Sequence, residues 1–232
     1  MAATAFGYQG AFISASVVVL VTLVFCFFYV REFPRESRVT SARTKHSVNK
    51  KTLIGWGLCF AASVQLMFLP SVLPNVFQGF RMEPNEAVKS AGLVVMLYTA
   101  TAMAGTFLLC KLTTRVTSHR LIIAVGIMGT VLQFLLSVTP GLTSFVAVRM
   151  LQTAMVAAVM PLVFSSFASD LDGKVIGFLN SSRFAGNALG PMIGTSVLAF
   201  SNLNWLYISI GSLGLLALVN YALSFAGSKT VN

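Results

Sequence analysis

The sequence contains, between residues 177 and 194, the stretch Gly177-Phe-Leu-Asn-Ser-Ser-Arg-Phe-Ala-Gly186-Asn-Ala-Leu-Gly190-Pro191-Met-Ile-Gly194. It lies within the mostly apolar run Val175–Phe200, which is long enough to cross a bilayer as one helix. Gly186, Gly190 and Gly194 recur at every fourth position, so they share one side of that helix and let a neighbouring backbone approach closely. Pro191 removes one backbone donor and should bend the helix beside this stripe. These features predict a close helix contact inside a membrane protein. The predicted helix-packing motif comprises Gly177, Gly186, Gly190, Pro191 and Gly194.

The composition of the whole chain is that of a membrane protein. Hydrophobic residues make up 56% and charged residues 9%, whereas soluble domains average about 45–50% apolar and about 25% charged. The net charge of +10 does not indicate a nucleic-acid partner, because nucleic-acid binders carry their basic residues on a water-facing patch. Cys26, Cys59 and Cys110 all lie in apolar runs, so we interpret them as buried apolar residues. The expected fold class is an all-α, polytopic transmembrane helical bundle.

Seven runs are long and apolar enough to be membrane helices, which need about 20 residues. They are Ala11–Val30, Leu53–Phe77, Ala91–Cys110, Leu121–Val138, Leu142–Phe164, Val175–Phe200 and Trp205–Phe225. The chain therefore divides into a single transmembrane helix (residues 1–30), a basic cytoplasmic linker (residues 31–52) and a six-helix bundle (residues 53–232). The triplets Leu53–Val138 and Leu142–Phe225 have similar lengths and must enter the membrane from opposite sides, which is the geometry of an inverted repeat.

Lys and Arg are distributed unequally between the two sides of the predicted bundle. The links after the first and third runs hold most of them, whereas the links on the opposite side hold only Arg81 and Lys89. Because basic residues concentrate on the cytoplasmic side, the N-terminus is predicted outside and the C-terminus in the cytoplasm. All six acids lie in links, so no predicted span carries a carboxylate for proton transfer. We expect a multi-pass protein of the cell inner (plasma) membrane.

The glycine–proline stretch resembles a motif of the major facilitator superfamily. This motif is the antiporter motif in the fifth helix of drug:proton antiporters, and a related copy stands in the eleventh helix. Arg149-Met-Leu-Gln152 resembles the R-x-x-Q motif of the fourth helix and its tenth-helix counterpart. These likenesses imply that residues 149–152 and 177–194 belong to the tenth and eleventh helices of such a transporter.

A third segment, Lys111–Arg120, stands where the family has G-x-L-x-D-R-x-G-R-K between its eighth and ninth helices. Leu112 and Arg115 match this pattern, while Thr114 replaces the Asp that latches the cytoplasmic gate in the family. The resemblance implies that Arg115 and Arg120 belong to the cytoplasmic gate loop.

The resemblance covers the whole chain, from the sixth to the twelfth helix of a twelve-helix transporter, so a missing N-terminal helical bundle is the expected partner. The implied function is proton-coupled efflux of drugs or other small amphipathic compounds, by rocking of two bundles around a midplane site. The first alternative is a metabolite permease of the same superfamily, for a sugar or an organic acid. The second alternative is a non-transporting seven-helix receptor or membrane interaction protein.

Arg183 is the first candidate for a substrate contact. It lies about 14 Å along the helix from Lys174, and Asn180 and Asn187 share its face. Because a charged side chain inside a membrane is costly, we expect Arg183 to face a cavity. There it would hold an anionic substrate group or pair with an acid of the missing bundle. The alternative is an Arg that bonds to backbone carbonyls at the bundle interface.

Further cavity candidates lie in three other runs. Arg149 is near the expected outer surface, where it either snorkels to water or serves the substrate pathway, and Gln152 lies one turn deeper. Gln65 lies in a run with two prolines, Pro70 and Pro74, which favour bending at a gate. The adaptable or aromatic side chains expected to line an apolar cavity are those of Tyr98, Met103, Met155 and Met160.

The sequence gives no sign of catalysis. His46 and His119 stand alone in basic links without the spacing of metal ligands. No phosphate-binding G-x-x-x-x-G-K-[ST] loop is present. We therefore expect no enzymatic activity, no cofactor and no metal. The expected partners are a small-molecule substrate, the lipid bilayer and the missing bundle.

Overall fold

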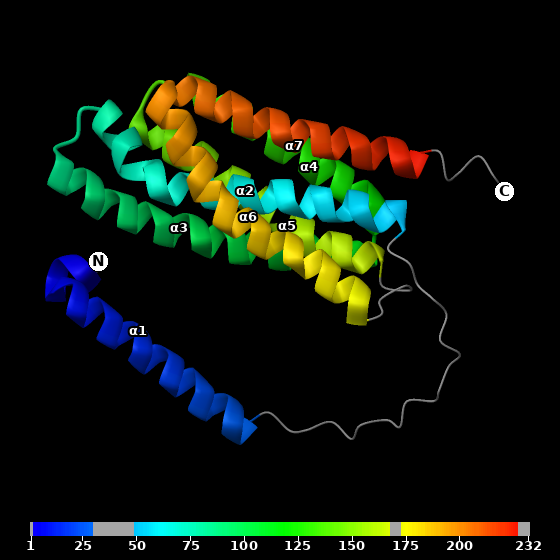
Figure 1. The fold of residues 1–232 in the computed structure, drawn as a ribbon, viewed down its shortest axis with the longest axis horizontal. Helices are drawn as coiled ribbons and strands as arrows, with labels where there is room; N and C mark the ends of the chain where they lie inside the picture. Colours follow the sequence, from blue (N-terminus) through cyan, green and yellow to red (C-terminus); the bar gives the residue numbers. More distant parts are fainter. Residues whose placement is uncertain (1, 30–48, 168–172, 227–232) are drawn as a thin grey trace. The chain divides into compact units, whose positions relative to one another are not determined.

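The computed structural model describes residues 2–29, 49–167 and 173–226. These residues form seven α-helices and two short 3-10 helices and contain no strand, which confirms the expected all-α fold (Figure 1). The helices are α1 (Ala2–Tyr29), α2 (Lys50–Gly79), α3 (Pro84–Lys111), α4 (Ser118–Leu135), α5 (Leu142–Ser166), α6 (Gly173–Phe200) and α7 (Leu203–Ala226). Each of them overlaps one of the seven predicted spans.

Two compact units make up the chain, residues 1–47 and residues 48–232. The first unit contains α1, whose side chains are exposed throughout the apolar stretch Ser16–Phe28. An apolar helix surface of this kind suits contact with lipid chains or other membrane helices. Most of the predicted basic linker, residues 30–48, lies outside the described residues.

Five helices of the second unit are long and apolar enough to cross a membrane, namely α2, α3, α4, α5 and α7. Helix α6 is as long as α3, but it contains the polar residues Asn180, Arg183 and Asn187 and is not among these five. The helices identify a protein that crosses the bilayer several times.

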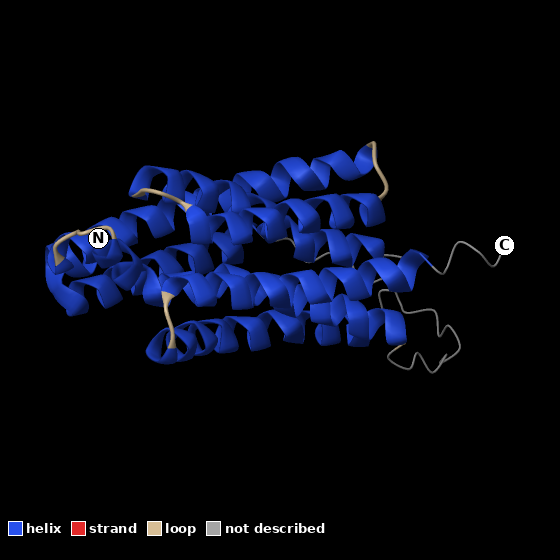
Figure 2. Ribbon diagram, turned by 90° about the horizontal axis from the view of Figure 1, so that it is seen from above, coloured by secondary structure: helices blue, strands red, loops and turns tan. Residues whose placement is uncertain are grey.

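The six helices of the second unit run alternately in opposite directions along the chain (Figure 1), and they lie lengthwise beside one another as a bundle (Figure 2). Their contacts are symmetrical. Helix α2, the first of its triplet, packs against α6 and α7, the second and third helices of the other triplet. Helix α5 packs in the same way against α3 and α4. The two first helices, α2 and α5, contact each other, as do the two third helices, α4 and α7. This exchange of equivalent partners is the pattern that the predicted inverted repeat requires.

Helices α2 and α5 form the central pair of the unit. Helix α2 is apolar around most of its circumference, as is typical of a helix within a protein core or a membrane. Its residues Val64 and Phe68 are completely buried, as is Leu162 of α5. Both helices contribute to both of the buried apolar clusters that fill the bundle along its length. The remaining four helices of the unit are arranged around this pair.

Candidate functional site

The glycine stripe of α6 lies directly against α2. Gly186, Gly190 and Gly194 are all buried. A Cβ atom at Gly186 would lie 2.5 Å from Ser63 Cβ, and one at Gly190 would lie 3.1 Å from Met67 Cβ. The first separation is shorter than any real Cβ contact and the second is very tight, so the two backbones approach this closely only because the stripe carries no side chains.

Gly177, the first glycine of the same motif, does not take part in this contact. It is exposed, and a Cβ atom there would meet nothing within 4 Å. The prediction that Gly177 belongs to the packing motif is therefore wrong. Nine residues separate it from Gly186, which at about 100° per residue places the two glycines on opposite sides of the helix. Pro191 is half-buried within α6, beside the stripe.

A second close approach, which the sequence analysis missed, joins α3 to α5. A Cβ atom at Gly105 would lie 2.5 Å from the carbonyl oxygen of Ala154 and 2.7 Å from its Cα atom. The pairs α3–α5 and α6–α2 are equivalent in the inverted repeat, so Gly105 does for the first triplet what the glycine stripe does for the second. A single glycine in an apolar run has no periodic partner and gave no signal in the sequence.

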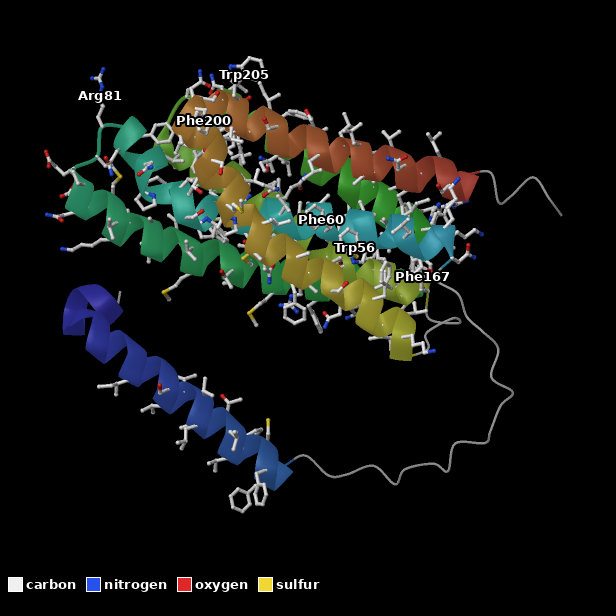
Figure 3. The ribbon with its side chains drawn as sticks, viewed as in Figure 1. Trp56, Phe60, Arg81, Phe167, Phe200 and Trp205 are labelled. Atoms are coloured by element: carbon white, nitrogen blue, oxygen red, sulfur yellow. The ribbon has the colours of Figure 1, made fainter. Side chains whose placement is uncertain are left out.

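Aromatic side chains extend the contact between α2 and α6 toward the N-terminal ends of both helices. Trp56 and Phe60 of α2 are stacked with their ring centroids 5.4 Å apart (Figure 3). Trp56 Nε1 donates a hydrogen bond to Ser181 Oγ of α6 at 2.9 Å, and Phe178 of α6 lies against the same indole. These contacts fix the rotation of α6 and thereby determine which of its polar residues face away from α2.

A cavity of about 840 Å³ lies between α2, α3, α5 and α6. Small-molecule sites commonly have volumes of about 300–1,000 Å³. Apolar side chains form most of the wall, among them Met67, Met103, Phe107 and Met160. Flexible thioether side chains of this kind adapt to ligands of different shapes. The predicted lining residues Met103 and Met160 are thus at the cavity, whereas Tyr98 and Met155 are not among its lining residues.

The charged and amide side chains among the lining residues are those of Lys111, Arg183 and Asn187. The side chain of Arg183 is exposed, and the described residues include no hydrogen-bond or ion-pair partner for it. The alternative in which Arg183 bonds to interface carbonyls is therefore not what the structure shows. Asn180, the third residue of the predicted polar face, is half-buried and does not line the cavity.

Lys111 was not among the predicted site residues. Helix α3 continues to this residue, and Met103, Phe107 and Lys111 follow one another at four-residue intervals on the face that lines the cavity. This spacing was the available signal. Arg115 and Arg120, the predicted gate-loop residues, are exposed near the connection between α3 and α4 and do not line the cavity.

Arg149 lies behind the cavity wall and is completely buried. Its Nη1 atom donates to Gln65 O at 3.1 Å and to Gln152 Oε1 at 2.7 Å. Its Nη2 atom donates to Gln65 O and Leu66 O, both at 3.1 Å. The guanidinium also lies over the ring of Tyr98, 5.2 Å from the centroid. Carbonyl oxygens and an aromatic face thus surround this cation in place of a carboxylate.

The interpretation of Arg149 as a snorkelling residue is wrong, because its side chain turns inward to α2. Gln65, Gln152 and Tyr98, the other candidates from these runs, are buried around it and do not line the cavity. Gln152 Nε2 donates in turn to Gln133 Oε1 at 3.1 Å. The predicted polar residues therefore divide into Arg183 and Asn187 at the cavity and a buried cluster around Arg149.

The described residues contain no group of three or more His, Cys, Asp and Glu side chains that would hold a metal ion. His119 lies in the first turn of α4, with Nδ1 3.2 Å from Tyr221 Oη. His46 lies outside the described residues.

A family model described as Major Facilitator Superfamily matches residues 53–231, which include helices α2 to α7. The chain belongs to the major facilitator superfamily. A comparison with curated proteins gives no match. Membership of the major facilitator superfamily makes the chain a multi-pass membrane transport protein and confirms the resemblance at this level. It also removes the ground for the seven-helix receptor alternative.

Proposed function

We propose that this chain forms one wall of the substrate pathway of a secondary transporter that exports small amphipathic compounds, in the manner of drug:proton antiporters. The cavity of about 840 Å³ between α2, α3, α5 and α6 carries the proposal. A largely apolar cavity with a few polar groups is the usual form of a small-molecule site. In a membrane transport protein, such a cavity among the membrane-spanning helices is the natural place for the transported compound. Its methionines suit compounds of varied shape.

A second helical bundle completes the pathway in this proposal. Alternating access requires two bundles that rock around a site near the midplane, and the described helices supply only one such bundle. The second bundle would also bring the carboxylate that proton coupling needs. Among the described residues the acids are Glu83 and Glu86, both at the start of α3 and away from the cavity. We assign no enzymatic activity to the chain.

The orientation proposed for the inner membrane follows from the basic residues of the second unit. One end of the bundle carries Lys50, Lys51, Lys111, Arg115, Arg120 and Lys174, whereas the other end carries Arg81 and Lys89. Because basic residues concentrate on the cytoplasmic side, the first of these ends belongs in the cytoplasm.

Accumulation of fluorescent dyes in the host organism tests the proposed function. Deletion of the coding sequence should raise the accumulation of amphipathic dyes, because an exporter is lost. The wild-type chain and the control variant Val219→Trp, which adds bulk at an exposed position of α7, should restore low accumulation. Ala157→Trp, which fills part of the cavity, should not restore it. Unchanged accumulation after deletion, for dyes of every charge, contradicts the proposal.

The metabolite permease remains the second candidate, and the cations Lys111 and Arg183 at the cavity favour an organic acid over a sugar as its substrate. The same deletion distinguishes the two functions. Loss of an exporter raises the amount of compound in the cell, whereas loss of an uptake permease lowers it.

A further inference from the structure

We infer that the compound carried through this cavity is an amphipathic anion, such as an organic carboxylate, sulfonate or phosphate ester with an apolar body. Arg183 and Lys111 would hold its charged group. The inference rests on the proposed function, because it assumes that the cavity holds the transported compound.

The charges that the described residues place at the cavity have one sign. Lys111 and Arg183 are its charged lining residues, and no described lining residue is an acid. The described acids Glu83 and Glu86 lie at the start of α3, whereas Lys111 ends that helix. About 38 Å of helix separates Glu86 from Lys111, so neither acid reaches the cavity to neutralise its cations.

Arg183 differs from Arg149, the buried arginine of α5, in the hydrogen-bond donors that remain free. Arg149 has carbonyl oxygens around its Nη atoms. Arg183 has no such partner among the described residues. A guanidinium presents five N–H donors in a planar fork, which matches the paired oxygens of a carboxylate, sulfonate or phosphate. Because Arg183 is exposed at the cavity and has no described partner, its fork is available to bind an anionic group.

The cavity offers polar groups for the charged end of such a compound and apolar groups for its body. Asn187 lies one turn from Arg183 on the same face of α6 and offers a further amide donor. Met67, Met103 and Met160 provide an apolar surface for the body of the compound. An organic cation of the same shape would meet two like charges at the cavity, which disfavours its binding.

Three naphthalene derivatives that share one ring system and differ in charge test the inference. They are naphthalene-sulfonate, naphthyl-methylammonium and the neutral naphthalene-methanol. Binding to the full chain in phosphatidylcholine nanodiscs is measured by equilibrium dialysis, with the uptake by empty nanodiscs subtracted. We expect the sulfonate to bind about tenfold more tightly than the ammonium, or by about 1.4 kcal/mol. This preference should shrink as salt concentration rises.

Variants of Arg183 in α6, compared with a control variant in α3, show whether Arg183 causes the preference. Arg183→Gln should remove most of it, and Arg183→Lys should retain part of it because the positive charge remains. Lys89→Gln is the matched control, since Lys89 is an exposed cation of α3 that does not line the cavity. It should leave the preference unchanged.

The possible outcomes separate this inference from the proposed function. Equal binding of all three probes, tighter binding of the ammonium, or equal effects of Arg183→Gln and Lys89→Gln overturn the anion inference. Each of these results leaves the transport proposal standing, because a cavity that does not select for negative charge still binds compounds. Failure of all three probes to bind overturns the inference. It also removes the support that the cavity gives to the proposed function.

Discussion

Arg149 Nη2 of α5 donates a hydrogen bond at 3.1 Å to the carbonyl oxygen of Leu66 in α2. In a regular helix this carbonyl would accept from the backbone N–H of residue 70, but residue 70 is a proline and has none. The guanidinium therefore replaces, from a neighbouring helix, the donor that Pro70 removes. This relationship explains why a fully buried cation without a carboxylate partner is stable between α2 and α5.

The first prediction concerns this replacement. Arg149→Met should lower the free energy of unfolding by about 1–3 kcal/mol, because buried carbonyl groups lose their donor. Pro70→Ala returns a backbone N–H to residue 70, so Arg149→Met should cost less in that background. Thermal unfolding of the wild type, both single variants and the double variant measures the coupling, which we expect to exceed about 0.5 kcal/mol. Strictly additive effects would show that Arg149 does not replace the missing donor.

The second prediction concerns the glycine stripe. Gly190→Leu should destabilise the protein by about 1–3 kcal/mol, because the new side chain has to separate α6 from α2. Gly177→Leu makes the same replacement in the same helix at an exposed position with open space, so it is the matched control and should be neutral or stabilising. Melting temperatures in detergent compare the two. Equal melting temperatures for the two variants would mean that the stripe is not a close interface.

The third prediction concerns the equivalent contact between α3 and α5. Gly105→Ala should already destabilise the protein, since its Cβ atom would lie 2.5 Å from the carbonyl oxygen of Ala154. Gly177→Ala should instead stabilise α6 by up to about 1 kcal/mol through helix propensity. Opposite shifts of the melting temperature are expected. Stabilisation by Gly105→Ala would show that α3 and α5 are farther apart than this structure places them.

The fourth prediction concerns orientation in the membrane. In a chain whose three cysteines are replaced by alanine, Asn85→Cys and Asn49→Cys place exposed thiols at opposite ends of the bundle. An impermeant thiol reagent applied to whole cells should label residue 85 and should label residue 49 only after the membrane is opened. Labelling of residue 49 in intact cells, with residue 85 protected, would reverse the proposed orientation.

The helices were predictable from the sequence because long apolar runs mark the segments that enter a bilayer. Leu142–Phe164 was expected as a span and α5 covers Leu142–Ser166. The ends were less predictable. Helix α3 begins at Pro84, seven residues before the expected Ala91, because an amphipathic first turn continues a helix beyond its apolar part.

The site was predictable only where one helix contains the whole signal. The sequence predicted a close helix contact at the stripe of Gly186, Gly190 and Gly194, but it did not show that α2 is the partner. The inward turn of Arg149 depends on a carbonyl group in a different helix, freed by Pro70, and no pattern within α5 reports it. Lys111 was missed because it stands at the border between a predicted span and a predicted link, where hydropathy does not decide which face a side chain joins.

The most direct test of the central claim, that the cavity is the path of a transported compound, is the reactivity of a thiol placed in it. Ala157→Cys at the cavity wall and Val219→Cys on the exposed side of α7 are compared in a chain without other cysteines, produced in the host organism. A thiol reacts as the thiolate, which forms only where water reaches it. We predict that a water-soluble thiol reagent modifies residue 157 and not residue 219, and that an exported dye slows the reaction at residue 157. A thiol at residue 157 that is as unreactive as the one at residue 219 would contradict the account.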